Sequence, residues 1–417
     1  MKRLLVITYY WPPTGGSGVQ RWVKFCKYLP QYGWQPVVYT PENPERLAYD
    51  ESLLKDIPGC VEVIRTRILE PYGIYRRLIG GNGGRTEVNP VNGGGKTALQ
   101  KLSLRVRGNF FIPDPRVSWV RPSLRFLKRW LKEHPVDAVV TTGPPQSMHL
   151  IGLGLKKALG LKWIADFRDP WTEIFYYKHL ELGRRADRRH HELERQVLDA
   201  ADTVIAVTPY VRDDFAARTK TPVALITNGF DEDDFAGVRP AVHEGKFTIV
   251  HTGLFAADGN PLNLWDVLAE KCGNDPEFAS KLQIRLAGKT DSEVTEAIRA
   301  RGLGDNLVDL GYLPHDEVVA EQMGADILIL PLRREPEYAK VLPGKIFEYL
   351  AAGRPVLGIG QEDGAAAEVL RDSGAGVMFG WDRRDGLMEF ICGAHDGASG
   401  IGKYSRRVLT EKLVELL

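Results

Sequence analysis

The stretch that decides the fold is Val341-Leu-Pro-Gly-Lys-Ile-Phe-Glu-Tyr-Leu-Ala-Ala-Gly-Arg-Pro-Val-Leu357. Pro343 and Gly344 are typical of a helix start, and Gly353 followed by a proline is typical of a helix end. Apolar residues recur between them at helical spacing and predict one buried face, formed by Ile346, Phe347, Leu350 and Ala351. The stretch therefore predicts a short helix that packs against a core.

Lys345 and Glu348 are three residues apart and share another face of this helix. The first turn of a helix has unpaired backbone N–H groups and the positive end of the helix dipole, so a phosphate fits at Gly344 beside Lys345. Glu348, one turn deeper, suits sugar hydroxyls. The alternative is a surface Lys–Glu pair that stabilises one helix by roughly 0.2–0.5 kcal/mol. The helix alone leaves both interpretations open.

Short apolar runs alternate with amphipathic segments on both sides of this helix, which predicts parallel, doubly wound α/β sheets. The predicted strands are 4–8, 36–40, 136–142, 163–166 and 203–207 in the first half, and 247–251, 282–287, 307–310, 327–331 and 356–359 in the second. The mixed polar stretch 237–246 is the expected linker. We therefore expect two Rossmann-like domains facing a cleft, with residues 1–236 in the first and 245–400 in the second.

Ligands of open α/β sheets bind at the carboxyl ends of the strands, so residues that directly follow the strands are site candidates. In the second domain these are Thr252, Gly253, Gly288 and Tyr312. In the first domain they are Asp166, Arg168 and Asp169. The alternative for this trio is an arginine ion-paired between two aspartates.

Gly15-Gly16-Ser17-Gly18 follows the first strand and opens a helix, where backbone N–H groups can hold a phosphate or a sugar. The motif is close to a dinucleotide fingerprint, but Arg21 occupies the position of the third glycine. No acidic residue ends the next strand, which argues against NAD. The alternative is a glycine loop that only turns the chain.

Composition sets further limits. The 55 basic and 54 acidic residues nearly balance, so no global field favours nucleic acid. Four scattered cysteines without a C-x-x-C pair argue against zinc or disulfides and favour the cytoplasm. The run Asp231–Asp234 follows Asn-Gly and indicates turn chemistry rather than a metal site. No apolar run approaches the roughly 18–20 residues of a membrane-spanning helix.

One local segment, Lys96–Lys132, is strongly basic and has apolar residues between its charges. This pattern suits peripheral contact with an anionic membrane, which would place the protein at the inner face of the cytoplasmic membrane. The alternative for residues 123–132 is a helix of the first domain that buries Leu124, Leu127 and Leu131. The stretch 97–111 is the better membrane candidate.

Several stretches, in order along the whole chain, resemble retaining GT-B glycosyltransferases of family four, in particular the bacterial exopolysaccharide and surface-glycan subgroup. They are Tyr9-Tyr-Trp-Pro-Pro13, Gly15-Gly-Ser-Gly18, Thr142-Gly-Pro-Pro145, His149-Leu-Ile-Gly152, Asp166-Phe-Arg-Asp-Pro-Trp171, Thr227-Asn-Gly-Phe-Asp231, His251-Thr-Gly253, Gly311-Tyr-Leu-Pro-His315 and Pro343–Pro355. Each motif is weak alone, but the ordered set is specific.

The resemblance implies a nucleotide sugar held mainly by the second domain and a glycan or polyprenyl-linked acceptor held mainly by the first. It implies transfer with retention and no bound metal or cofactor. Glu348 matches the ribose-binding glutamate, and Gly16 and Gly18 match a loop that approaches the diphosphate. Gly344 and Lys345 would then hold the phosphates. Asp166 and Asp169 would lie on the acceptor side, and Asp169, Arg168 and Lys345 would take part in catalysis. A last helix, about 403–417, crosses back to the first domain in such folds.

The chain departs from the family pattern at three places. Lys340 replaces a second glutamate, Leu254 and the loop 256–260 replace an arginine and a lysine, and 167–169 replaces a histidine near the acceptor. Two alternative functions therefore stay open. One is a catalytically silent nucleotide-binding relative in a glycan-assembly complex, and the other is a sugar-nucleotide epimerase.

Overall fold

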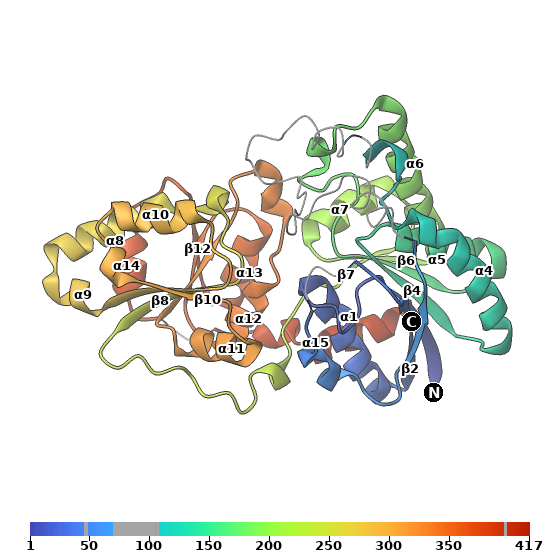
Figure 1. Cartoon of the computed structure of the whole chain (residues 1–417), viewed down its shortest axis with the longest axis horizontal. Coiled ribbons are helices and arrows are strands. Elements are labelled where there is room, and N and C mark those ends of the chain that lie inside the picture. The colour runs from blue at the N-terminus through green and yellow to red at the C-terminus, as the bar shows by residue number, and fades with distance from the viewer. Residues whose placement is uncertain (46–48, 70–104, 106–107, 396–397) are drawn as a thin grey trace, which may run out of the picture. The chain divides into compact units, whose positions relative to one another are not determined.

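The computed structural model describes residues 1–45, 49–69, 105, 108–395 and 398–417 (Figure 1). The chain divides into two compact units, which we call unit 1 (Met1–Thr227 with Thr410–Leu417) and unit 2 (Asn228–Leu409). Each unit has one parallel sheet with helices packed against it, so the predicted pair of Rossmann-like domains is confirmed. The division falls after Thr227, ahead of the expected linker.

Unit 1 contains a seven-stranded sheet of order β3-β2-β1-β4-β5-β6-β7, in which all neighbours are parallel. Its strands are β1 (Lys2–Ile7), β2 (Trp34–Pro41), β3 (Glu62–Thr66), β4 (Ala138–Gly143), β5 (Trp163–Phe167), β6 (Thr203–Ala206) and β7 (Val223–Leu225). The central strands are buried along their length because helices cover both faces.

The helices of unit 1 are α1 (Ser17–Tyr28), α4 (Val117–Glu133), α5 (Ser147–Leu159), α6 (Arg184–Ala200) and α7 (Pro209–Arg218), with 3-10 turns η1 (Leu29–Tyr32), η2 (Ser52–Asp56) and η3 (Tyr177–Leu180). In α4, Leu127 and Leu131 are buried and Leu124 packs against the same core, as the domain-helix interpretation of 123–132 requires. Of the stretch 97–111, residues 97–104 and 106–107 lie outside the described part of the chain.

Unit 2 contains a six-stranded sheet of order β10-β9-β8-β11-β12-β13, again parallel throughout. Its strands are β8 (Phe247–Thr252), β9 (Leu282–Ala287), β10 (Leu307–Gly311), β11 (Ile327–Pro331), β12 (Val356–Ile359) and β13 (Gly376–Phe379). Ile249 and Val250 belong to two different core clusters, because successive strand residues point to opposite faces.

The helices of unit 2 are α8 (Leu262–Asn274), α9 (Pro276–Lys281), α10 (Ser292–Ala300), α11 (His315–Gly324), α12 (Lys345–Ala352), α13 (Ala365–Ser373) and α14 (Leu387–Cys392), with η4 (Glu232–Asp234), η5 (Ala257–Gly259), η6 (Gly304–Asn306), η7 (Pro336–Lys340) and η8 (Ile401–Tyr404). The last helix, α15 (Arg406–Leu416), begins in unit 2, and its residues from Thr410 belong to unit 1.

Helix α12 is the helix that the sequence predicts between Gly344 and Gly353. Gly353 ends it in the left-handed conformation with φ 68°, where glycine is favoured. Ile346, Phe347 and Leu350 are fully buried, and Ala351 is partly buried. Among the described residues, no helix combines the length and the apolar character needed to cross a membrane.

Gly152 of α5 offers a test of the helix-to-sheet packing in unit 1. A Cβ there would overlap the indole of Trp163 and lie 2.7 Å from Thr141 Cγ2. We expect Gly152→Ala to lower the free energy of unfolding by about 1–3 kcal/mol, measured by urea denaturation. Gly273→Ala in α8 is the control, since a Cβ there meets open space, and it should raise stability by up to about 1 kcal/mol. Equal effects would contradict this packing.

Candidate functional site

Two glycine turns lie against each other at the carboxyl end of the sheet in unit 2. Gly253 follows β8 with φ 93°, and Gly288 follows the neighbouring β9 with φ 121°. The Gly253 N–H donates to the Ala287 carbonyl at 2.7 Å, and a Cβ on Gly288 would overlap the Gly253 carbonyl. Both positions therefore require glycine, for the positive φ and for the close approach of the two backbones.

Lys345, the first residue of α12, reaches back to the turn after β8. Its Nζ lies 3.3 Å from His251 Nε2 and 3.2 Å from the Leu254 carbonyl oxygen. A Cβ on Gly253 would lie 3.5 Å from the same Nζ. The Lys345 ammonium therefore connects the start of α12 to the end of β8 and to the glycine turn after it.

His251 is neutral and its tautomer follows from its partners. The side chain is fully buried, and burial together with the Lys345 charge holds the pKa of His251 well below its ordinary value. Its Nδ1 lies 3.1 Å from the Ile329 carbonyl and its Nε2 lies 3.3 Å from the Leu254 carbonyl. Because Nε2 also faces the Lys345 ammonium, which can only donate, a proton on Nδ1 gives both ring nitrogens a partner. Nε2 is then an acceptor, and the Lys345 ammonium donates to it. One of the three ammonium hydrogens remains for another acceptor.

Burial shifts the pKa of both charged residues of α12. It lowers the pKa of Lys345 to about 8, against the opposing effect of Glu348. Burial raises the pKa of Glu348, against the effects of His315 and of a hydrogen bond from Gln322 Nε2 at 3.3 Å. In both groups, burial disfavours the charged form.

Thr252 is part of the same arrangement. Its backbone N–H donates to the Tyr349 hydroxyl at 3.0 Å, and its hydroxyl accepts from Gln322 Nε2 at 2.9 Å. These contacts join β8, α11 and α12, so the side chain of Thr252 is occupied by the protein. The predicted donor-side residue Thr252 thus holds its neighbours in place through buried polar contacts.

The first turn of α12 has free donors. The N–H groups of Ile346 and Phe347 donate to Pro343 and Gly344, whereas those of Gly344 and Lys345 donate to no carbonyl in the described residues. Gly344 itself is exposed. The arrangement suits an anion that accepts these hydrogen bonds beside the Lys345 ammonium. Tyr312 follows the edge strand β10 and is 87% exposed, and the carbonyl of the preceding Gly311 accepts from the Gly288 N–H at 2.6 Å.

Two of the three places where the sequence departs from the family pattern that it resembles lie in unit 2. Leu254 gives its carbonyl oxygen to Lys345. In the loop after it, Asp258 pairs with Arg333 at 2.8 Å. Lys340, at the end of η7, is exposed. The ammonium of Lys345 lies at the Gly253 turn.

In unit 1, Asp166 does not present its carboxylate to a ligand. It is fully buried and accepts hydrogen bonds from Arg21 Nη2 at 2.8 Å, Trp22 Nε1 at 2.8 Å and Thr142 Oγ1 at 2.8 Å. Burial would raise the pKa of Asp166, but Arg21 and these hydrogen bonds hold it below its ordinary value. The expected acceptor-side role of Asp166 is thus replaced by a structural one.

Arg168 is held by backbone carbonyls, and no ion pair of Arg168 with Asp166 or Asp169 is present among the described residues, so the alternative of an ion-paired trio finds no support in these contacts. Its guanidinium donates to the carbonyls of Gly18 and Pro144, and its Nε donates to Gly143 at 3.3 Å. A Cβ on Gly18 would lie 2.7 Å from Arg168 Nη1. Arg168 therefore joins the loops after β1, β4 and β5, and Gly18 leaves room for it.

Gly16 and Asp169 differ from these neighbours. Gly16 has φ 108° with open space where a Cβ would stand, so its backbone conformation requires glycine.

Asp169 is partly buried and accepts no hydrogen bond within the described chain. Burial, opposed by Arg168, raises the pKa of Asp169 to about 6. Asp169 is thus the carboxylate of the trio that is available to a ligand.

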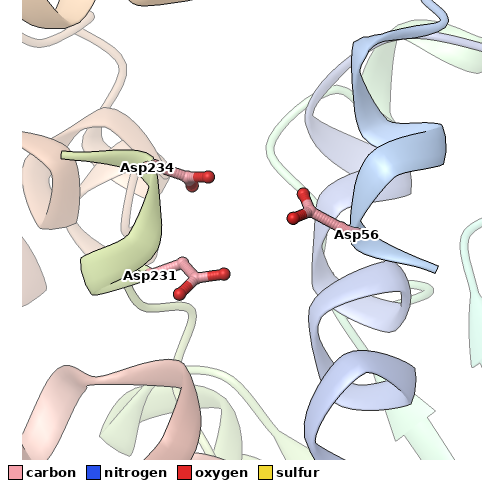
Figure 2. A group of neighbouring side chains, drawn as sticks. All are labelled: Asp56, Asp231 and Asp234. Carbon is pink, nitrogen blue, oxygen red and sulfur yellow. The ribbon is translucent and has the colours of Figure 1, made fainter. Parts of the chain in front are cut away.

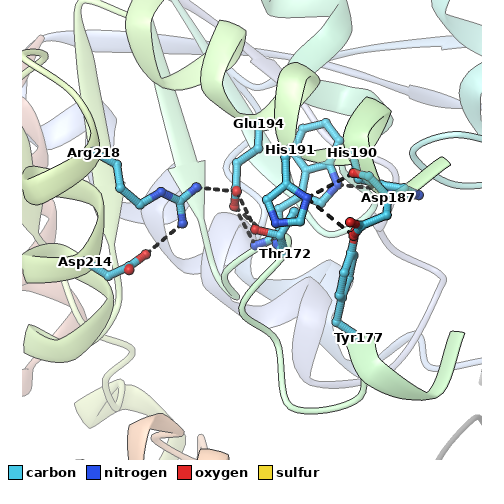
Figure 3. Close-up of polar contacts among 9 residues, drawn as sticks. Thr172, Tyr177, Asp187, His190, His191, Glu194, Asp214 and Arg218 are labelled. Carbon is cyan, nitrogen blue, oxygen red and sulfur yellow. Dashed lines mark hydrogen bonds and ion pairs between the residues drawn. The ribbon is translucent and has the colours of Figure 1, made fainter. Parts of the chain in front are cut away.

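The loop that follows Asp169 is held by Glu194 of α6, a residue that the sequence analysis did not single out. Figure 3 shows its buried carboxylate at Thr172, where it accepts from the backbone N–H at 3.2 Å and from the hydroxyl at 2.6 Å. It also accepts from the backbone N–H of Trp171 at 3.2 Å and pairs with Arg218. Arg218 in turn pairs with Asp214 at 2.9 Å.

The acidic run Asp231–Asp234 forms the turn that the sequence predicts. The Asp231 side chain accepts from the backbone N–H of Asp233 at 3.2 Å at the start of η4, and Figure 2 shows it with Asp234. Asp56, also drawn in Figure 2, belongs to unit 1, where it pairs with Lys24 at 2.8 Å and Lys27 at 3.4 Å.

Comparison with known families places this geometry in a class. Residues 81–234 match the model of "Glycosyltransferase Family 4", and residues 247–394 match that of "Glycosyl transferases group 1". The chain therefore belongs to the family-4-like glycosyltransferases with the GT-B fold.

Individual relatives agree with this class. Mannosylfructose-phosphate synthase of Agrobacterium fabrum is 24% identical over 283 residues, which cover 60% of each chain. Sucrose-phosphate synthase from Thermosynechococcus elongatus has the same fold, with a TM-score of 0.60 and 14% identity over 100% of this chain and 98% of that one. WaaG, a glycosyltransferase involved in lipopolysaccharide biosynthesis, has a TM-score of 0.54 and 15% identity over 99% and 92%.

Glu194 gives a direct test of the loop that carries Asp169. Glu194→Ala would leave the N–H groups of Trp171 and Thr172 and the Arg218 charge without their acceptor. We expect a loss of at least about 2 kcal/mol in the free energy of unfolding, measured by urea denaturation. Glu192→Ala on the exposed face of α6 is the control and should change it by less than about 0.5 kcal/mol. A small effect of Glu194→Ala would contradict its anchoring role.

Proposed function

We propose that this protein is a retaining glycosyltransferase that moves a sugar from a nucleotide diphosphate sugar to a glycan or lipid-linked glycan acceptor in surface-polysaccharide assembly. The observation that carries the proposal is the position of Lys345, whose ammonium lies at the Gly253 turn beside free N–H groups at the start of α12. A diphosphate fits this arrangement better than an uncharged ligand does.

The donor would bind in unit 2. Its diphosphate would accept from the N–H groups of Gly344 and Lys345 and from the Lys345 ammonium, while Glu348 accepts from ribose hydroxyls. Breaking the bond between sugar and diphosphate leaves negative charge on the diphosphate, and the helix dipole and Lys345 are placed to stabilise it. Because the site supplies positive charge of its own, we propose that transfer needs no metal ion or cofactor.

The acceptor would bind in unit 1, where Asp169 has a free carboxylate with a pKa of about 6. Such a group can accept a hydrogen bond from an acceptor hydroxyl at neutral pH. Gly16 and Gly18 would lie in the loop that approaches the diphosphate. Support for a surface-glycan role comes from the ordered family-four motifs. We propose peripheral contact with the inner face of the cytoplasmic membrane through the basic segment 96–132, mainly through its stretch 97–111.

A panel of nucleotide sugars incubated with the full chain tests this function. Slow donor hydrolysis, or transfer to an added acceptor lipid, is the expected result. Binding without turnover would instead indicate a silent nucleotide-binding relative, and an isomeric nucleotide sugar would indicate an epimerase. Either of these outcomes would overturn the proposal.

Glu348→Ala tests the ribose contact. We expect at least about tenfold weaker donor binding with the fold retained, because the ribose hydroxyls lose a charged acceptor. Titration calorimetry with the donor selected from the panel measures this change. Glu317→Ala, which removes an exposed carboxylate on the neighbouring α11, is the control. Unchanged donor affinity of Glu348→Ala would end the ribose assignment.

Lys345→Ala tests the role of the ammonium in the reaction. We expect kcat to fall more than donor affinity, because the diphosphate gains charge only as the bond to the sugar breaks. Since the pKa of free Lys345 is about 8, the charge is present below that pH, and donor affinity should weaken as pH rises through it. Lys340→Ala, an exposed lysine, is the control. Equal losses in binding and rate would indicate simple anchoring.

Asp169→Asn tests the acceptor side. We expect transfer to fall while donor binding is spared. In the parent protein kcat/KM should decrease as pH falls through about 6, because Asp169 with a pKa of about 6 then becomes protonated. The variant should lack this acid limb. Normal transfer by Asp169→Asn would show that the carboxylate has no part in acceptor binding.

A further inference from the structure

Helix α6 has an exposed basic face that the proposed site does not use. Between residues 178 and 189 the chain has five basic residues and two acidic ones. Five arginines of α6 are exposed: Arg184, Arg185, Arg188, Arg189 and Arg195. Arg189 pairs with Glu192 at 3.4 Å, whereas the other four form no ion pair with any residue that the structure describes. We call these five side chains the arginine face.

The arginines of this face do not stabilise their own helix. Arg184 and Arg185 occupy the first turn, where the positive end of the dipole disfavours cations. Asp187 is the acidic residue of that turn, and the last turn has no basic residue. Arg184 and Arg188 are four residues apart and repel each other, as do Arg185 and Arg189. The helix forms because its other face is buried, so helix stability does not account for these arginines.

An exposed aromatic side chain stands next to this face. Asn109 Oδ1 accepts from the Gly183 N–H at 2.7 Å, and Asn109 Nδ2 donates to the Glu181 carbonyl at 3.3 Å. These bonds hold residues 108–110 against the start of α6. The neighbouring Phe110 is 78% exposed. Guanidinium groups beside an exposed aromatic ring suit the polar-to-apolar boundary of a lipid bilayer.

We infer that the arginine face, together with Phe110, is the surface through which unit 1 docks on an anionic lipid bilayer. Charge complementarity favours this occupant, because each arginine near an anionic headgroup layer adds to the attraction. The inference deepens the proposed function, since a lipid-linked acceptor is presented at such a surface. The basic residues of α4 belong to a separate surface, because α5 lies between α4 and α6 (Figure 1).

Co-sedimentation of the full chain with vesicles of phosphatidylcholine and phosphatidylglycerol in equal parts tests the inference. We expect binding at low salt that is lost at high salt. Arg184→Glu combined with Arg188→Glu should weaken it at least about tenfold. The matched control on α4 is Arg125→Glu combined with Arg129→Glu, which has the same spacing and charge change at exposed positions. It should stay within about threefold of the parent protein.

Three further readouts separate docking from its alternatives. The α6 double variant should melt no lower than the parent protein, because glutamates near the helix start complement the dipole. Arg184→Lys with Arg188→Lys should keep vesicle binding. Donor hydrolysis by the α6 double variant should match the parent, so that a failure of docking and a failure of the transferase proposal are distinguishable.

The inference is wrong if both glutamate variants lose vesicle binding equally, or if the α6 variant binds as well as the parent protein. Equal binding to vesicles of phosphatidylcholine alone would also contradict it, because the arginines would then have no part. Tighter binding to duplex DNA than to anionic vesicles at the same salt would assign the arginine face to a nucleic acid instead.

Discussion

A buried ion pair between Arg21 and Asp166 sets the arrangement of unit 1. Arg21 of α1 donates to Asp166 at the end of β5, and also to the carbonyls of Ile226 and Thr227 at 2.9 Å and 2.7 Å. Burying two charges is costly unless every donor and acceptor is paired, and removing one partner of such a pair typically costs about 3–5 kcal/mol. The pair thus fixes the glycine loop before α1 and the Asp169 loop after β5 at the carboxyl ends of the strands.

In unit 2 a single cation, Lys345, is held in a fixed position by its hydrogen-bond partners. Lys345 lies in the turn after β8 because His251, held neutral by burial, offers Nε2 as an acceptor while its Nδ1 donates to Ile329. The same helix places Glu348 one turn deeper. A charged group at the start of α12 therefore has a fixed position before any ligand arrives, which is the preorganisation that stabilisation of a leaving diphosphate requires.

Much of the fold could be predicted because its signals are local. Apolar runs gave the parallel strands, and Gly344, Gly353 and the spacing of Ile346, Phe347 and Leu350 gave α12. The contacts that decide individual roles join distant residues. Arg21 and Asp166 are 145 positions apart, and Lys345 and His251 are 94 apart. For the same reason the sequence could not show that Asp166, and not Asp169, has its carboxylate hydrogen-bonded within the core. Nor could it show that Glu194 of α6 holds the loop that follows Asp169.

The most direct test of the account is a crystal structure of the full chain with a bound nucleoside diphosphate. The account predicts phosphate oxygens within hydrogen-bond distance of the Gly344 and Lys345 N–H groups and of Lys345 Nζ, with ribose hydroxyls on Glu348. A diphosphate bound elsewhere, with Lys345 still donating only to His251 and Leu254, would contradict it.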